Sequence, residues 1–227
     1  MVIVWTVVLI VQATLCLVLL VSNPPKYRAF TGWMIADLLI SVTLYDQQSF
    51  GALYDPLWRG AQLALLLPMA WAVMEAYRNL AADLRYWRFT DFYVIPTAGC
   101  AALIFRLAQD RPLRWPWSSL EETWTAISVV CCFLGLALFA VMFSASRKPL
   151  RRTVEYLHAV LLCAYLAGNC LYYAGLSRFR FGPMPIIWMA GMFYLFRLAI
   201  VFPDRKRVVR VMPPRRVPDS DGERTLA

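Results

Sequence analysis

A single acidic residue interrupts a long apolar run near the start of the chain. Residues 30–45 read FTGWMIADLLISVTLY, and Asp37 is flanked on both sides by apolar or small residues. Within a membrane, a charge at the centre of such a run costs at least about 2.5–3.5 kcal/mol, so it faces other helices or a wet cavity. An acid in that position can bind a ligand or couple the passage of a proton or cation. Trp33 and Ser41 lie four positions to either side of Asp37, on the same helix face.

Other apolar runs carry uncharged polar side chains at a comparable depth. Gln12 lies midway along the first run, and Tyr165 and Asn169 lie one helical turn apart in a later run. The alternative for Gln12 and Asn169 is plain hydrogen bonding between helices, worth about 0.6 kcal/mol on average. The candidate ligand-binding residues are therefore Asp37, Trp33, Ser41, Gln12, Tyr165 and Asn169.

A second set of polar residues lies near the ends of the apolar runs that are expected on the cytoplasmic side. Glu75 closes the third run, Glu155 and His158 open the sixth, and Arg197 lies late in the seventh. An ion pair between Arg197 and an acid could hold the inner ends of the helices together as a polar latch. The alternative is that Arg197 extends its side chain to the membrane–water interface.

Motifs of the common enzyme classes are missing from the sequence. None of GxGxxG, GxxxxGK, HExxH or GxSxG occurs. Paired histidine ligands for haem are excluded because His158 is the only histidine, and no cysteine belongs to a CxxC pair. We therefore expect no catalytic residues, no metal and no cofactor, while an active site assembled from different helices stays open.

The scaffold for these residues follows from the composition. Of the 227 residues, 60% are hydrophobic and 16% are charged, and the mean hydropathy is +0.55. Soluble domains are closer to half apolar and about a quarter charged. Apolar blocks recur along the chain, and their length is close to the roughly 20 residues that a membrane-spanning helix needs. The sequence predicts an all-α polytopic membrane protein, a seven-transmembrane-helix bundle over residues 1–202. The predicted spans are residues 2–22, 29–46, 56–77, 90–107, 122–145, 153–175 and 183–202.

Lys and Arg residues are shared unevenly between alternate loops. Sixteen fall in the first, third and fifth loops and the C-terminal tail, whereas five fall in the other loops. Because cytoplasmic loops carry the excess, we expect the N-terminus outside and the C-terminus cytoplasmic. We expect the plasma (inner) membrane as the location. Residues 203–227, which are basic and without apolar periodicity, predict a disordered cytoplasmic tail. The net charge of +9 reflects these segments, so no nucleic-acid binding is predicted.

Seven spans with an external N-terminus also suggest a retinal protein, which the lysines exclude. Lys26, Lys148 and Lys206 all lie outside the predicted spans, where none can form a Schiff base inside the bundle.

We expect a non-enzymatic, sensor- or receptor-like bundle that binds a small ligand or lipid in its interior. The alternatives are a small proton- or cation-coupled transporter and an accessory structural subunit of a larger membrane complex. Expected partners are the bilayer, the small molecule or lipid, and another membrane protein or a second copy of this chain.

Overall fold

The structure is a computed structural model that describes residues 2–22, 27–45, 51–81, 87–109, 119–145, 154–179 and 184–208. Within these ranges it contains seven α-helices, one short 3-10 helix and no strand. The elements are α1 (Val2–Ser22), α2 (Arg28–Thr43), η2 (Gly51–Leu53), α4 (Tyr54–Ala81), α5 (Trp87–Leu107), α6 (Leu120–Ala145), α7 (Val154–Phe179) and α8 (Met184–Val208).

Each predicted span overlaps one of the seven α-helices, and the fold class is helical as expected. In the described part of the chain, four helices, α1, α4, α6 and α7, are long and apolar enough to cross a membrane. Shorter apolar stretches lie in α5 and α8, at Phe92–Leu107 and Met184–Ile200. The chain is therefore a helical integral membrane protein. α8 continues to Val208, six residues beyond the predicted end of the seventh span. The rest of the predicted tail, residues 209–227, lies outside the described residues.

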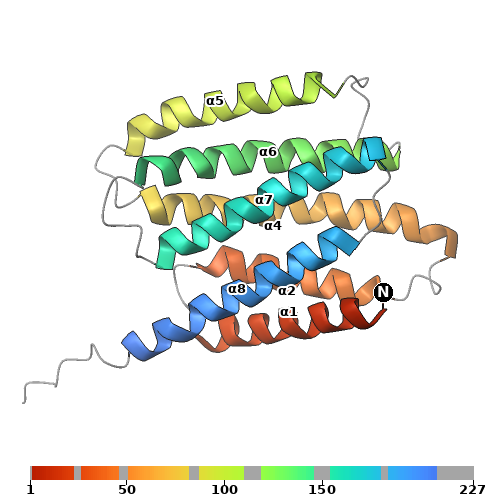
Figure 1. Cartoon of the computed structure of the whole chain (residues 1–227), viewed down its shortest axis with the longest axis horizontal. Coiled ribbons are helices and arrows are strands. Elements are labelled where there is room, and N and C mark those ends of the chain that lie inside the picture. The colour runs from red at the N-terminus through yellow and green to blue at the C-terminus, as the bar shows by residue number, and fades with distance from the viewer. Residues whose placement is uncertain are drawn as a thin grey trace, which may run out of the picture.

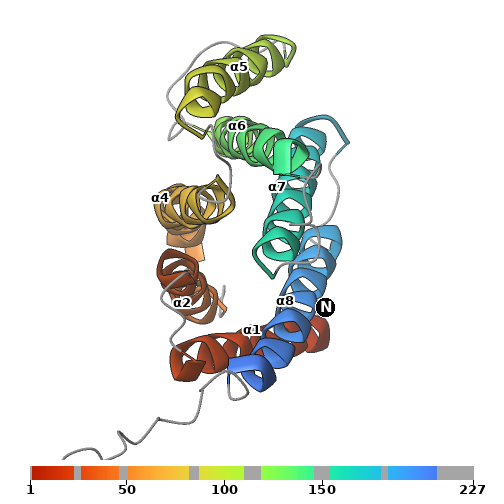
Figure 2. The same cartoon turned by 90° about the vertical axis from the view of Figure 1, so that its left-hand side faces the viewer.

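The helices run side by side along the long axis of the molecule (Figure 1). In the end-on view, six of them form a ring in the order α1, α2, α4, α6, α7, α8, and α8 closes the ring by packing on α1 (Figure 2). α5 lies outside this ring against α6 (Figure 2). The first helix thus packs directly against the last, which places residues from both ends of the chain around one interior.

Glycines allow α8 to approach its two neighbours closely. A Cβ atom on Gly168 of α7 would overlap the side chain of Met189 on α8. A Cβ atom on Gly191 of α8 would lie 3.0 Å from a methyl group of Val8 on α1. Small residues are the usual means by which membrane helices pack tightly, because the surrounding lipid supplies no hydrophobic force between them. The ring closes at these two crossings.

One half of the bundle has a closely packed interior, and we call it the closed half. It is the half in which α2 and α7 begin. At its centre Phe30 is fully buried, and its ring meets His158 edge-on at 4.7 Å and Phe193 at 6.1 Å between centroids. We call the other half, where α1, α4, α6 and α8 begin, the open half, because a cavity described below lies there.

Apolar side chains on the outside of the ring suit contact with lipid. Leu39 and Val42, whose helical spacing from Asp37 places them on the other side of α2, are 62% and 56% exposed. Leu67 on α4 and Leu171 on α7 are exposed in the same way. Large apolar side chains of α2, α4 and α7 therefore form part of the outer surface of the ring.

Candidate functional site

A cavity of about 920 Å³ occupies the interior of the open half. All six helices of the ring contribute to its lining. The candidate residues Asp37, Trp33, Ser41, Gln12, Tyr165 and Asn169 all lie on this lining. They come from only three helices, α1, α2 and α7. The structure thus brings together around one space every residue that the sequence suggested for ligand binding.

Asp37 receives two hydrogen bonds, and both end on the same carboxylate oxygen. Gln12 on α1 donates through Nε2 to Oδ2 at 2.8 Å, and Tyr194 on α8 donates through its hydroxyl to the same oxygen at 2.8 Å. Gln12 Nε2 also lies 3.5 Å from the carbonyl oxygen of Met34. These bonds connect α1, α2 and α8 at one point, where the first and last helices meet.

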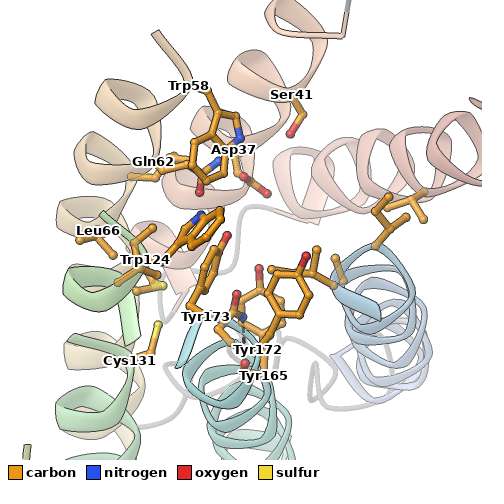
Figure 3. A pocket seen from close by; sticks show the side chains of 18 of the residues that line it. Asp37, Ser41, Trp58, Gln62, Leu66, Trp124, Cys131, Tyr165, Tyr172 and Tyr173 are labelled. Atoms are coloured by element: carbon orange, nitrogen blue, oxygen red, sulfur yellow. Dashed lines mark hydrogen bonds between the residues drawn. The ribbon is translucent and has the colours of Figure 1, made fainter. Parts of the chain in front are cut away.

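The second carboxylate oxygen of Asp37, Oδ1, has no hydrogen-bond donor among the described residues. Asp37 itself is half-buried and lines the cavity. Figure 3 shows its side chain directed into the same space as Trp124 and Tyr173. A carboxylate oxygen in this position is available to accept a hydrogen bond from a molecule in the cavity.

Rings form the wall of the cavity that faces the closed half. Trp33 and Tyr165 line the cavity and lie 5.8 Å apart between centroids, and Tyr165 packs in turn on Phe193, a core residue whose ring lies 4.6 Å away. Asn169 donates to the backbone oxygen of Tyr165 at 2.9 Å, one turn earlier in α7. Gln12 therefore bonds between helices, as its simpler interpretation anticipated, whereas this bond of Asn169 stays within its own helix.

Sequence reasoning missed Tyr194 and most of the aromatic lining. Tyr194 carries a hydroxyl on a large apolar ring, so its presence in an apolar run gave no sign of an unusual environment. A weak signal was its spacing from Arg197, three positions later on the same helix face. The tryptophans Trp5, Trp58 and Trp124 also line the cavity. Tryptophan near the end of a span is typical of a membrane interface, which hid this second role.

Glu75, one of the predicted latch residues, binds the beginning of α2. Its two carboxylate oxygens accept hydrogen bonds from the backbone N–H groups of Ala29 and Phe30, each at 3.0 Å. The first N–H groups of a helix have no partner within the helix, and an acid there also interacts favourably with the helix dipole. Glu75 on α4 therefore fixes the start of the helix that carries Asp37.

Two other predicted latch residues, His158 and Arg197, lie in the core of the closed half. Arg197 is 1% exposed, which does not fit the alternative of a side chain extended to the interface. Its guanidinium carbon lies 4.7 Å from the ring centre of Tyr27 and 5.3 Å from that of Phe30. His158 is equally buried and meets the same two rings edge-on. Glu155 lies half-buried in the first turn of α7. The predicted ion pair between Arg197 and an acid stays a prediction.

The fold and the cavity define a class: helical integral membrane proteins with a polar and aromatic chamber inside a ring of helices. Comparison of the chain with protein-family models, with curated proteins and with solved structures found no match.

Proposed function

We propose that all seven α-helices cross the membrane, with the N-terminus outside and the C-terminus in the cytoplasm. The excess of Lys and Arg in alternate loops supports this orientation. α2 has 16 helical residues, which at about 1.5 Å per residue spans roughly 24 Å, so it requires some thinning of the bilayer or polar contacts at its ends. In this orientation the open half, and therefore the cavity, lies toward the outside of the cell.

The proposed orientation can be tested by reporter fusions. A reporter after Ala227 should be cytoplasmic, and one inserted near Gln47, outside the described residues, should be external. The measurement is the activity of a paired enzyme reporter, one member active only in the cytoplasm and the other only outside. Reversed signals at both positions would place the cavity on the cytoplasmic side.

We propose that the protein binds a small ligand within the bundle and acts as a sensor or receptor-like module. The observation that supports this function is the cavity of about 920 Å³ with Asp37 on its lining. Ligand sites of proteins commonly have volumes of about 300–1,000 Å³, with mostly apolar walls and a few placed polar groups. The signal would pass to a separate membrane protein or to a second copy of this chain.

A coupled transporter is the second candidate, and Asp37 favours it. Acids within membrane helices commonly mark proton relays and ion pathways. Transport would require the cavity to open alternately to the two sides, whereas a receptor requires only occupancy. Uptake of a cavity ligand into sealed proteoliposomes, with and without a pH gradient, separates the two functions. Accumulation driven by the gradient favours the transporter, and binding without accumulation favours the receptor.

Occupancy of the cavity can be measured with the protein's own tryptophans, four of which line it. We expect benzyl compounds to change the tryptophan fluorescence of the purified protein in a saturable manner. Ser41→Phe, which places a ring in the cavity, should abolish the saturable part. Ser144→Phe, the same change on an exposed position of α6, should leave it intact. Equal responses of the two variants would show that the probes enter the detergent rather than the cavity.

Asp37 is tested by two substitutions. Asp37→Asn retains a group that can hydrogen-bond while removing the charge, so it should fold normally and bind cavity ligands differently. Asp37→Leu removes the polar group at similar volume and should weaken the contacts from Gln12 and Tyr194. Parental stability and parental binding in both variants would leave the accessory-subunit interpretation as the better one.

A further inference from the structure

The charged side chains that line the cavity are all of one sign. They are Asp37, Asp55 and Glu121, and no Lys, Arg or His occurs among the described lining residues. The chain as a whole carries a net charge of +9, so this acidic lining is opposite to the general composition. Asp55 and Glu121 lie in the first turns of α4 and α6 and are exposed, whereas Asp37 lies deeper and is half-buried. A cation that enters from the end where α4 and α6 begin therefore passes Asp55 and Glu121 before it reaches Asp37.

Asp37 is the group that would hold such a cation. Its two partners, Gln12 and Tyr194, are uncharged donors, and both occupy Oδ2. A carboxylate away from bulk water is stabilised by a partner of opposite charge, and no described cavity-lining residue supplies one. Oδ1 is the remaining acceptor, and a charged N–H donor from a ligand would complete both the hydrogen bonding and the charge balance.

The walls around Asp37 are suited to an organic cation. Among the described residues, four tryptophans and five tyrosines line the cavity. Of these, Trp58, Trp124 and Tyr173 surround the space in front of Asp37 (Figure 3). Aromatic faces attract cations within about 6 Å, and cages of such rings recognise ammonium groups. Hard metal ions instead require six or more oxygen ligands, and no described cluster of three His, Cys, Asp or Glu could hold a metal ion.

The closed half shows that this chain already stabilises a buried cation with aromatic rings. The guanidinium of Arg197 lies 4.7 Å and 5.3 Å from the ring centres of Tyr27 and Phe30. That space is filled by the protein's own side chain, whereas the aromatic space beside Asp37 is a cavity of about 920 Å³. The volume is large enough for an amine that carries a sizeable apolar body.

We propose that the cavity binds an organic cation, a protonated amine attached to an apolar or aromatic body. Its N–H group donates to Oδ1 of Asp37, and its body lies against the tryptophan and tyrosine rings. This proposal rests on the proposed function, since it names the chemical class of the ligand that the cavity receives.

The test compares three probes of one size and three charges: benzylamine, benzyl alcohol and benzoate. Each is titrated into the purified full-length protein near pH 7, and the saturable change in tryptophan fluorescence that Ser41→Phe abolishes is taken as binding. We expect benzylamine to bind at least about tenfold more tightly than benzyl alcohol, because a charge-assisted hydrogen bond is about twice as strong as a neutral one. Benzoate should bind weakest of the three.

Three variants test which side chains cause the preference for benzylamine over benzyl alcohol. Asp37→Asn should reduce the ratio of benzylamine to benzyl alcohol affinity to less than about threefold, since the amide keeps the hydrogen bonding without the charge. Glu122→Gln is the matched control, because it removes one acid from α6 at a position that does not line the cavity, and it should keep the parental ratio. Trp124→Leu should weaken benzylamine more than benzyl alcohol, because the ring attracts the cation specifically.

The outcomes separate this proposal from the proposed function. If all three probes bind with equal affinity and Ser41→Phe still blocks them, the cavity is a ligand site but the cation inference is overturned. If Ser41→Phe blocks none of them, both are overturned. The comparison of probes on the parent protein decides the charge preference even if Asp37→Asn does not fold.

Discussion

The open and closed halves of the bundle each hold a charged side chain inside the ring of helices, but its surroundings differ between them. In the open half, Asp37 receives directed hydrogen bonds from Gln12 and Tyr194 and faces a cavity. In the closed half, Arg197 is 1% exposed and lies against the faces of Tyr27 and Phe30. The carboxylate of Asp37 accepts both bonds at one oxygen and faces the cavity, whereas the guanidinium of Arg197 packs against aromatic rings.

This difference shows that a charge in an apolar span is not in itself a sign of a ligand site. Asp37 and Arg197 gave the same signal in the sequence, since both interrupt an apolar run. The distinction depends on whether neighbouring helices fill the space around the charge. Arg197 has a long apolar stem and a planar group that stacks on rings, so it can contribute to a packed core. The short carboxylate of Asp37 leaves space that other side chains do not fill.

The largest effect should come from removing a ring of the closed half. Phe30→Ala should lower the free energy of unfolding by about 3–5 kcal/mol, because it leaves a void beneath Arg197 and His158 in a packed core. Trp58→Ala should cost less than half of that, since Trp58 is half-buried and borders a cavity that already exists. The measurement is unfolding in mixed micelles with a rising fraction of denaturing detergent. Equal losses would show that the two halves are packed alike.

The positions of the helices along the chain could largely be predicted from the sequence, because helices that cross a membrane need long apolar blocks. Leu39 and Val42 turn outward as the spacing from Asp37 required. The inward placement of Asp37 also followed, because a charge must avoid lipid. Its grouping with Gln12 was expected only from comparable depth, and the structure shows that α1 and α2 are neighbours.

Other features could not be predicted because they depend on which helices are neighbours. Glu75 binds the start of α2 only because α4 packs beside α2, and no local pattern encodes that pairing. Tyr194 reaches Asp37 because α8 closes the ring onto α1. The cavity arises where the six helices of the ring leave space between them, and the sequence of no single helix determines that space. The ligand-binding role of its residues stays a prediction.

An intermediate effect should come from the glycines that set helix distances. Gly168→Ala introduces a Cβ that overlaps Met189, whereas Gly135→Ala places a Cβ 3.5 Å from Leu166, an ordinary contact. Both changes gain the same helix propensity, so the difference between them isolates the steric conflict. We expect Gly168→Ala to be about 1–3 kcal/mol less stable than Gly135→Ala in the same mixed-micelle assay. Similar stabilities would mean that the Met189 side chain moves aside at little cost, so that α7 and α8 keep their distance.

The smallest effect should come from the hydroxyl of Tyr194, and it tests how Asp37 is held in the open half. Tyr194→Phe keeps the buried ring but removes the donor that lies 2.8 Å from Oδ2. Gln12 still donates to that oxygen, so the carboxylate keeps one of its two bonds. Hydrogen bonds between membrane helices average about 0.6 kcal/mol and reach about 1.7 kcal/mol, and the loss should fall in this range.

Tyr45→Phe is the matched control, because its hydroxyl also joins two segments, α1 and the residues that follow α2, but lies at an exposed position, 3.1 Å from the Thr6 hydroxyl. Its effect should stay within about 0.5 kcal/mol, as for most surface substitutions. If Tyr194→Phe is as harmless as Tyr45→Phe, Asp37 is held by Gln12 alone, and the closing contact of α8 contributes nothing to the acid's position. If it instead costs more than about 1.7 kcal/mol, Tyr194 stabilises the carboxylate as well as the contact between helices, and the open half depends on a polar contact as the closed half depends on its rings.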